Sequence, residues 1–138
     1  MAGWLLDTNV LSETSRPIPD QGVLDFIARV EPVFISAVSV HELHFGIERL
    51  PASQRQKRLR EWLSEIERLH SDSIVGVGIE ETEAAAQLRA QASRQGKTLH
   101  LGDGLIAGTA LRHGLVLVTR NVSDFVGLPM RVLDPWTS

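Results

Sequence analysis

Short apolar runs that alternate with helical patterns are the feature that most limits how this chain can fold. Five runs have the composition of buried β-strands, and most of the segments between them have the periodicity of helices. Strands that alternate with helices form a mostly parallel sheet that is covered on both faces. We therefore expect an α/β fold, with strands within residues 3–7, 33–37, 73–78, 115–119 and 131–134.

Three of the intervening segments are predicted to be helices. Residues 54–70 carry an apolar stripe at steps of three and four residues, made of Leu59, Trp62, Leu63, Ile66 and Leu69. This stripe is expected in the core or at a subunit contact, and an exposed strip that includes Trp62 or Leu63 would serve a dimer. Residues 80–95 and 103–113 form the other two helices, which end at Gly96 and Gly114 because glycine readily adopts the left-handed conformation.

Length and composition favour one globular domain. The chain has 138 residues, of which 43% are hydrophobic, and it contains no cysteine, which excludes disulfides, thiolate metal sites and cysteine nucleophiles. No apolar run approaches the roughly 18 residues of a membrane span, and the first residues lack the pattern of a signal peptide. We therefore expect a cytoplasmic protein that does not enter the membrane.

The charge of the chain is mildly acidic overall, but its basic residues are unevenly distributed. The formal net charge is −3, which speaks against nucleic-acid binding through overall positive charge. Five basic residues nevertheless fall within twelve positions: Arg49, Arg55, Lys57, Arg58 and Arg60. They would either form a basic surface for contact with nucleic acid or a solvated helix face.

Four acidic residues are predicted to meet at one edge of the sheet. Asp7 follows the first strand, Glu42 comes shortly after the second, Asp103 opens the helix before the fourth, and Asp124 lies beyond the fourth. Sites in open α/β sheets form outside the carboxyl ends of the strands, where the strand order reverses. Two carboxylates about 6 Å apart repel by roughly 3 kcal/mol at an effective dielectric constant near 20, so clustered acids require a compensating cation.

The atoms available at this edge are hard oxygen ligands, which suit Mg²⁺ or Mn²⁺ better than Zn²⁺. Polar neighbours that could support the acids through hydrogen bonds are Thr8, Asn9, Thr119 and Asn121. Two of the acids also have a structural interpretation. Ser39 and Glu42 match a capping box at the start of a helix, and Asp103 could cap its helix or favour the positive end of the helix dipole.

Other catalytic motifs are incomplete. The HELH stretch at residues 41–44 resembles the start of a zinc-protease helix, but that motif requires a histidine at the position of Phe45. No serine lies in a G-x-S-x-G turn. A phosphatase of the haloacid dehalogenase type would need a second aspartate at the position of Asn9.

Four segments, each with one of the four acids, resemble in order and spacing the signature segments of PIN-domain ribonucleases. They read LLDTNVLSE, SAVSVHELHFG, DGLIAGTA and VTRNVSDF. Within this family the chain looks most like the VapC and FitB toxins of bacterial toxin–antitoxin pairs, and its ending LDPW is similar to that of the FitB branch. The resemblance covers nearly the whole chain. It implies a single PIN domain over residues 1–138, with a parallel sheet of about five strands flanked by helices.

The resemblance also implies an activity, a cofactor and partners. The activity is Mg²⁺- or Mn²⁺-dependent hydrolysis of RNA phosphodiester bonds, with Asp7 and Asp103 as principal ligands of one or two ions and with Glu42 and Asp124 completing the site. The partners are a second copy of the chain and a cognate antitoxin that fills the acidic groove. One departure from the family pattern is that Gly102 and Gly104 flank Asp103, which predicts a looser helix start. The alternative is a PIN-like domain that binds RNA or protein without cleaving.

Overall fold

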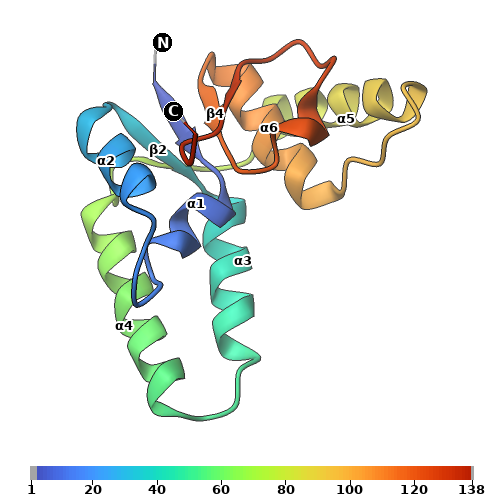
Figure 1. Ribbon diagram of the computed structural model, residues 1–138. Coiled ribbons are helices and arrows are strands. Elements are labelled where there is room, and N and C mark those ends of the chain that lie inside the picture. Colours follow the sequence, from blue (N-terminus) through green and yellow to red (C-terminus); the bar gives the residue numbers. More distant parts are fainter. Residues whose placement is uncertain (1–2, 138) are drawn as a thin grey trace.

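The computed structural model describes residues 3–137 and contains one parallel sheet with the strand order β3-β2-β1-β4-β5 (Figure 1). The strands are β1 (Trp4–Leu6), β2 (Val33–Ser36), β3 (Ile74–Val75), β4 (Val116–Val118) and β5 (Val132–Leu133). Each lies within one of the five predicted runs, so the predicted α/β fold is confirmed. The central strand β1 pairs Leu5 with Phe34 of β2 and with Leu117 of β4.

Helices fill the segments between the strands. They are α1 (Thr8–Glu13), α2 (Gln21–Arg29), α3 (Ala37–Glu48), α4 (Gln54–Leu69), α5 (Ile79–Arg94), α6 (Leu101–His113) and the short 3₁₀ helix η1 (Val122–Phe125). The three predicted helices correspond to α4, α5 and α6, each within two residues of the predicted ends. Gly96 and Gly114 have φ angles of 77° and 66°, so both adopt the left-handed conformation that was predicted.

The sheet separates two hydrophobic cores because successive side chains of a strand point to opposite faces. On one face, Leu5 and Leu117 pack with side chains of α5 and α6. On the other face, Leu6 and Val118 pack with side chains of the helices α1 to α4. Leu63 of the predicted stripe belongs to this second core and is only 1% exposed, so a core role is confirmed for that residue.

Helices α5 and α6 approach each other closely at Gly108. A Cβ atom at this position would lie 2.5 Å from the backbone nitrogen of Ala85 and 2.7 Å from the carbonyl oxygen of Glu81. Both neighbours are backbone atoms of α5, which cannot rotate away as a side chain can. Glycine at position 108 is therefore required for this close contact between α5 and α6.

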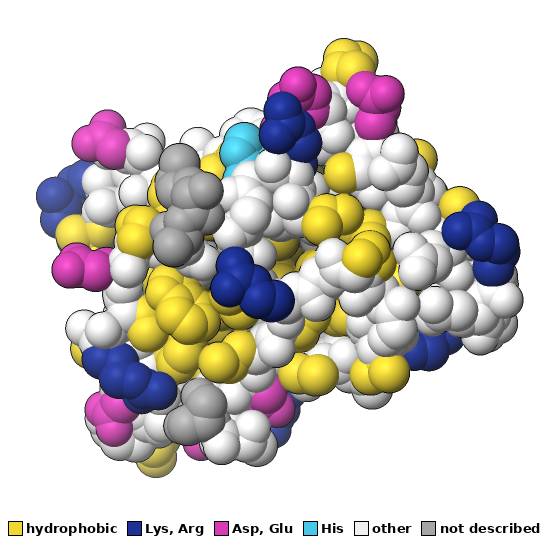
Figure 2. All heavy atoms as spheres, turned by 90° about the horizontal axis from the view of Figure 1, so that it is seen from above, with side chains coloured by type: hydrophobic (Ala, Val, Ile, Leu, Met, Phe, Trp, Pro, Cys, Tyr) yellow, Lys and Arg dark blue, Asp and Glu magenta, His cyan; other side chains and the backbone are white. Residues whose placement is uncertain are grey.

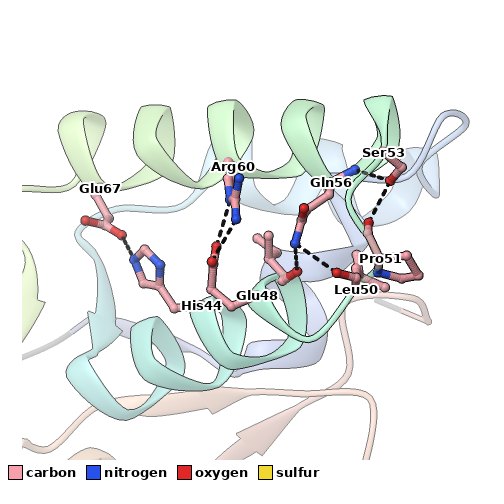
Figure 3. A network of polar contacts seen from close by, with 9 residues as sticks. His44, Glu48, Leu50, Pro51, Ser53, Gln56, Arg60 and Glu67 are labelled. Carbon is pink, nitrogen blue, oxygen red and sulfur yellow. Dashed lines mark hydrogen bonds and ion pairs between the residues drawn. The ribbon is translucent and has the colours of Figure 1, made fainter.

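Helices α3 and α4 form an arm that extends beyond the carboxyl ends of the strands (Figure 1). Polar contacts cross between the two helices along their length, as Figure 3 shows. The buried Gln56 donates from its side chain to the carbonyl oxygens of Ile47 and Leu50, both at 3.0 Å. Arg60 of α4 makes a bidentate ion pair with Glu48 of α3. The arm is thus held at its tip by hydrogen bonds to backbone carbonyls and further along by a surface ion pair.

No helix within residues 3–137 is both long enough and apolar enough to cross a bilayer.

Candidate active site

The strand order reverses at β1, whose neighbours β2 and β4 lie on opposite sides. In open α/β sheets, this switch point is where ligand sites form, next to the carboxyl ends of the strands. Asp7 directly follows β1, and Thr119 directly follows β4. The hydroxyl of Thr119 donates to Oδ2 of Asp7 at 2.8 Å, which joins the two segments across the switch point.

Asp7 is 5% exposed and is surrounded by hydrogen-bond donors. Its Oδ1 accepts from the backbone amide of Thr8 at 2.8 Å, so Asp7 is the N-cap residue of α1. The Asn9 side-chain amide donates to Oδ2 of Asp7 at 3.4 Å and to the Thr119 hydroxyl at 3.1 Å. These contacts fix the direction of the Asp7 carboxylate before any ligand binds.

Burial raises the pKa of Asp7 to about 6, despite the hydrogen bonds from Thr119 and Thr8 that lower it. The negative charges of Asp103 and Glu42 raise this pKa further. Ionisation of Asp7 is therefore less favourable in the folded protein than in water. A bound cation would reverse this penalty, because it favours the charged form of a neighbouring carboxylate.

Glu42 lies in the second turn of α3, facing α1. The capping-box interpretation is wrong, because α3 begins at Ala37 and its N-cap is Ser36, whose hydroxyl accepts from the amide of Val38 at 3.0 Å. Ser39 is instead a buried residue within the helix. The hydroxyl of Thr8 donates to Oε1 of Glu42 at 2.6 Å, so α1 holds Glu42 near Asp7.

Asp103 lies in the first turn of α6 and is half-buried. Burial raises its pKa, and the charges of Glu42 and Asp124 contribute to the same shift. The proposed capping role is wrong, because the N-cap of α6 is His100 and no side chain caps this helix. Its position in the first turn remains compatible with a favourable interaction with the helix dipole.

The glycines on both sides of Asp103 have a steric role. A Cβ atom at Gly102 would lie 2.8 Å from Oε2 of Glu42, and one at Gly104 would lie 2.6 Å from Cδ of Arg89. The amide of Gly104 donates to the carbonyl of His100 at 2.8 Å, so the helix is formed at its start and the prediction of a looser start is wrong. Gly102 allows the carboxylate of Glu42 to lie against α6, next to Asp103.

Asp124 lies on η1 and is exposed. The ammonium group of Lys97 donates to the carbonyl oxygens of Ser123 and Val126, which attaches the segment around Asp124 to the loop before α6. Asn121 precedes η1, and its backbone amide donates to the Thr119 hydroxyl at 3.1 Å. Of the four predicted supporting residues, Thr8 and Thr119 thus contact acids directly, Asn9 contacts Asp7 at longer range, and Asn121 acts through its backbone.

The four acids come from separate segments and form a chain of charge interactions around the end of β1. Asp7 interacts with Asp103 and Glu42, and Asp103 interacts with Glu42 and Asp124. Within residues 3–137, no three acidic or histidine side chains are close enough to form a complete metal-binding cluster. This arrangement fits Mg²⁺, which is typically held by one or two carboxylates and retains several water ligands.

The opposite end of the molecule has a different distribution of side chains from the edge that carries the four acids. Figure 2 shows the face near the amino-terminal ends of the strands, where hydrophobic side chains occupy much of the middle and acidic side chains lie mostly toward the margin. Neither histidine of the HELH stretch contacts one of the four acids of the candidate site: His41 stacks on Phe45, and His44 pairs with Glu67 of α4.

The five clustered basic residues do not form one patch. Arg60 is paired with Glu48, and the guanidinium of Arg49 lies 5.6 Å from the ring centroid of Phe45. Lys57 is exposed on α4. Arg55 and Arg58 line a cavity together with Trp62. Sequence analysis did not identify Arg16, which lines the same cavity, because it is far from the cluster along the chain.

A parallel sheet with acidic side chains at its switch point places the chain among the open α/β proteins, whose ligand sites lie at the carboxyl ends of the strands. Residues 4–125 match the PIN domain family, so the chain belongs to this family. It is 34% identical over 135 residues to the VapC ribonuclease Y4jK of Sinorhizobium fredii, a match that covers 96% of each chain.

Two further comparisons concern Neisseria gonorrhoeae. The chain is 35% identical over 135 residues to the toxin FitB of this organism, covering 96% of this chain and 97% of FitB. It superposes on a chain of the crystal structure of FitAcB with a TM-score of 0.89 at 33% identity, covering 98% of this chain and 99% of that chain. The suspected resemblance to PIN-domain toxins of the VapC and FitB type is confirmed.

Proposed function

We propose that the chain is a Mg²⁺- or Mn²⁺-dependent endoribonuclease toxin that hydrolyses RNA phosphodiester bonds and consists of one PIN domain over residues 1–138. The observation that carries the proposal is the buried Asp7 at the sheet switch point. It lies near enough to Glu42 and Asp103 for their negative charges to raise its pKa. The similarity to relatives named as a ribonuclease and a toxin supports the same assignment.

In this proposal Asp7 and Asp103 are the principal metal ligands, and Glu42 and Asp124 complete the site or hold water molecules of the cation. A divalent cation bound there would lower the pKa of a water molecule and offset the negative charge that develops on the phosphate. Thr119 and the amide of Thr8 orient the Asp7 carboxylate, and the Thr8 hydroxyl orients Glu42. These hydrogen bonds reduce the reorganisation that binding would otherwise require.

The hydrolysis also requires a group that accepts the proton of the attacking water. A base with a pKa near the working pH is the most efficient acceptor. The pKa values of Asp7 and Asp103 are both raised toward that range. In the protein alone, each of these carboxylates is therefore a stronger base than an exposed aspartate.

We further propose a homodimer that is neutralised by a cognate antitoxin and that acts in the cytoplasm. The buried Leu63 is not available for a dimer contact. A more suitable surface contains Phe45 and Leu101, which are 60% and 59% exposed and border an apolar cavity of about 680 Å³. Glu42 also lines this cavity, so a partner subunit bound there would lie next to the acidic site.

The test of the proposed function is RNA cleavage. The purified protein is incubated with total cellular RNA in Mg²⁺ or in chelator, and the new RNA ends are mapped by sequencing. We expect Mg²⁺-dependent cuts at defined sites, absent with Asp103→Asn and retained with Asp72→Asn, which changes an exposed acid outside the site. RNA binding without cuts by the parent protein would instead support the non-catalytic PIN-like domain.

A further inference from the structure

Three adjoining cavities lie beside the acidic site, between α1, the following turn and α4. Their volumes are about 600, 390 and 370 Å³, and Ser15 and Arg55 line all three. We call them together the arginine groove. Its basic and aromatic side chains are Arg16, Arg49, Arg55, Arg58, Arg120, Trp62 and Trp136.

The arginine groove is continuous with the acidic site. Thr8 and Glu42 line its middle cavity, and these two residues are hydrogen-bonded to each other at the site. Asn9 lines another of the cavities and donates both to Asp7 and to Thr119. A polymer that occupies the acidic site can therefore continue into the groove without crossing an intervening element.

The groove carries positive charge that the protein does not neutralise. Arg16 is paired with the buried Glu13, which also accepts from the amide of Asp20. Among the ion pairs of residues 3–137, none involves Arg55, Arg58 or Arg120. Three guanidinium groups without an ion-pair partner, on a chain with a net charge of −3, favour the approach of an anionic ligand to this surface.

Two tryptophans in the groove have orientations fixed by their neighbours. The indole N–H of Trp62 donates to the hydroxyl of Thr14 at 3.1 Å, and the ring is half-buried. The guanidinium of Arg120 lies 4.7 Å from the ring centroid of Trp136. Basic grooves with aromatic side chains are the surfaces on which single-stranded nucleic acids bind, with phosphates on the cations and bases on the rings.

We propose that the arginine groove holds single-stranded RNA on one side of the bond to be cleaved, with Arg55 and Arg58 contacting phosphates and Trp62 stacking on a base. This inference rests on the proposed ribonuclease function and specifies its substrate as unpaired RNA. It assigns RNA contacts to Arg55 and Arg58, which belong to the clustered basic residues, and excludes Arg60, whose guanidinium is already paired with Glu48.

The test measures binding separately from cleavage. A fluorescent single-stranded RNA of ten nucleotides is titrated in chelator with protein that carries Asp7→Asn, and its anisotropy is followed at several salt concentrations. We expect Arg55→Ala with Arg58→Ala to weaken binding about tenfold and to reduce the slope of log K against log salt by about 1.4, which corresponds to two lost phosphate contacts. Trp62→Leu should weaken binding about fivefold or more without changing this slope.

The matched control removes the same charge elsewhere, with Arg94→Ala and Arg131→Ala, both exposed residues outside the groove cavities. Equal RNA affinities of the groove variant and this control would overturn the proposal. A parent protein that does not bind the RNA would also overturn it. An anionic polyglutamate peptide is titrated in the same way. If the groove variant loses affinity for this peptide but retains its affinity for RNA, the groove binds an acidic peptide and the proposal is overturned. If the groove variant loses RNA binding but the parent protein never cuts RNA, the groove is an RNA-binding site and the proposed ribonuclease function is wrong.

Discussion

Asp7→Asn is expected to reduce RNA cleavage about a hundredfold or more, because it removes the charge of a proposed metal ligand. Loss of a residue that only supports a metal ligand typically costs about 10- to 100-fold in activity. The side chain keeps its size, and one of its two polar atoms can still accept from Thr8 or Thr119. The folded structure should therefore be retained. The measurement is the initial rate of Mg²⁺-dependent cleavage of a mapped RNA site, relative to the parent protein.

The same substitution is expected to make the protein more stable above pH 6 in the absence of metal. The folded state raises the pKa of Asp7 from 3.8 to about 6, so the folded protein binds this proton more tightly than the unfolded chain. The stability that this group contributes is fully present below pH 4 and is lost as the pH rises through about 6. The total loss is about 3 kcal/mol. Asparagine avoids this loss, although its amide group matches the donors around it less well, by about 1 kcal/mol.

We therefore expect Asp7→Asn to raise the free energy of unfolding by about 1–2 kcal/mol at pH 8 in chelator, with no gain at pH 4. Urea denaturation at both pH values measures the difference. Asp72→Asn should change the stability little at either pH. A variant that is inactive and also less stable than the parent protein at pH 8 would contradict this prediction. It would show that Asp7 stabilises the fold as a helix cap and that its ionised form does not destabilise the folded protein.

Gly108→Ala is expected to destabilise the fold by about 2–4 kcal/mol, because the added methyl group overlaps backbone atoms in a packed helix contact. The overlap involves the amide nitrogen of Ala85 and the carbonyl of Glu81, so it can be relieved only by moving α5 away from α6. The movement would also displace the first turn of α6, which carries Asp103. The measurement is the midpoint of urea denaturation.

The control for this prediction is Gly46→Ala, since nothing lies within 4 Å of a Cβ atom at that position. Alanine in an open position of a helix should stabilise α3 by about 0.5–1 kcal/mol. Opposite signs for the two glycine substitutions would support the packing described. Equal effects would mean that α5 and α6 are not in such close contact in solution.

The arrangement of the fold was accessible from sequence because it depends on patterns within short segments. The five strands are apolar runs bounded by polar residues, and Gly96 and Gly114 mark the ends of two helices. Helices α1 and α2 carried no comparable signal. Helix α1 has only six residues, and its start is defined by Asp7, a residue that sequence analysis had assigned to metal binding alone.

The errors at the candidate site arose where a local pattern competed with a contact between distant segments. Ser39 and Glu42 have the spacing of a capping box, but Ser36 caps α3 and the hydroxyl of Thr8 binds Glu42 from another helix. The glycines next to Asp103 suggested flexibility, whereas they accommodate the side chains of Glu42 and Arg89. Neither contact can be read from spacing along the chain, because the partners are brought together only by the fold.

The proposal that acids from four separate segments share one cation is tested most directly by a titration of stability with metal. Unfolding of the parent protein, Asp7→Asn and Asp72→Asn is followed at pH 8 with increasing Mg²⁺ or Mn²⁺. A cation at 100 times its dissociation constant stabilises the folded state by about 2.7 kcal/mol. We predict this gain for the parent protein and Asp72→Asn, and little or none for Asp7→Asn, whereas equal gains in all three proteins would contradict a shared cation site at Asp7.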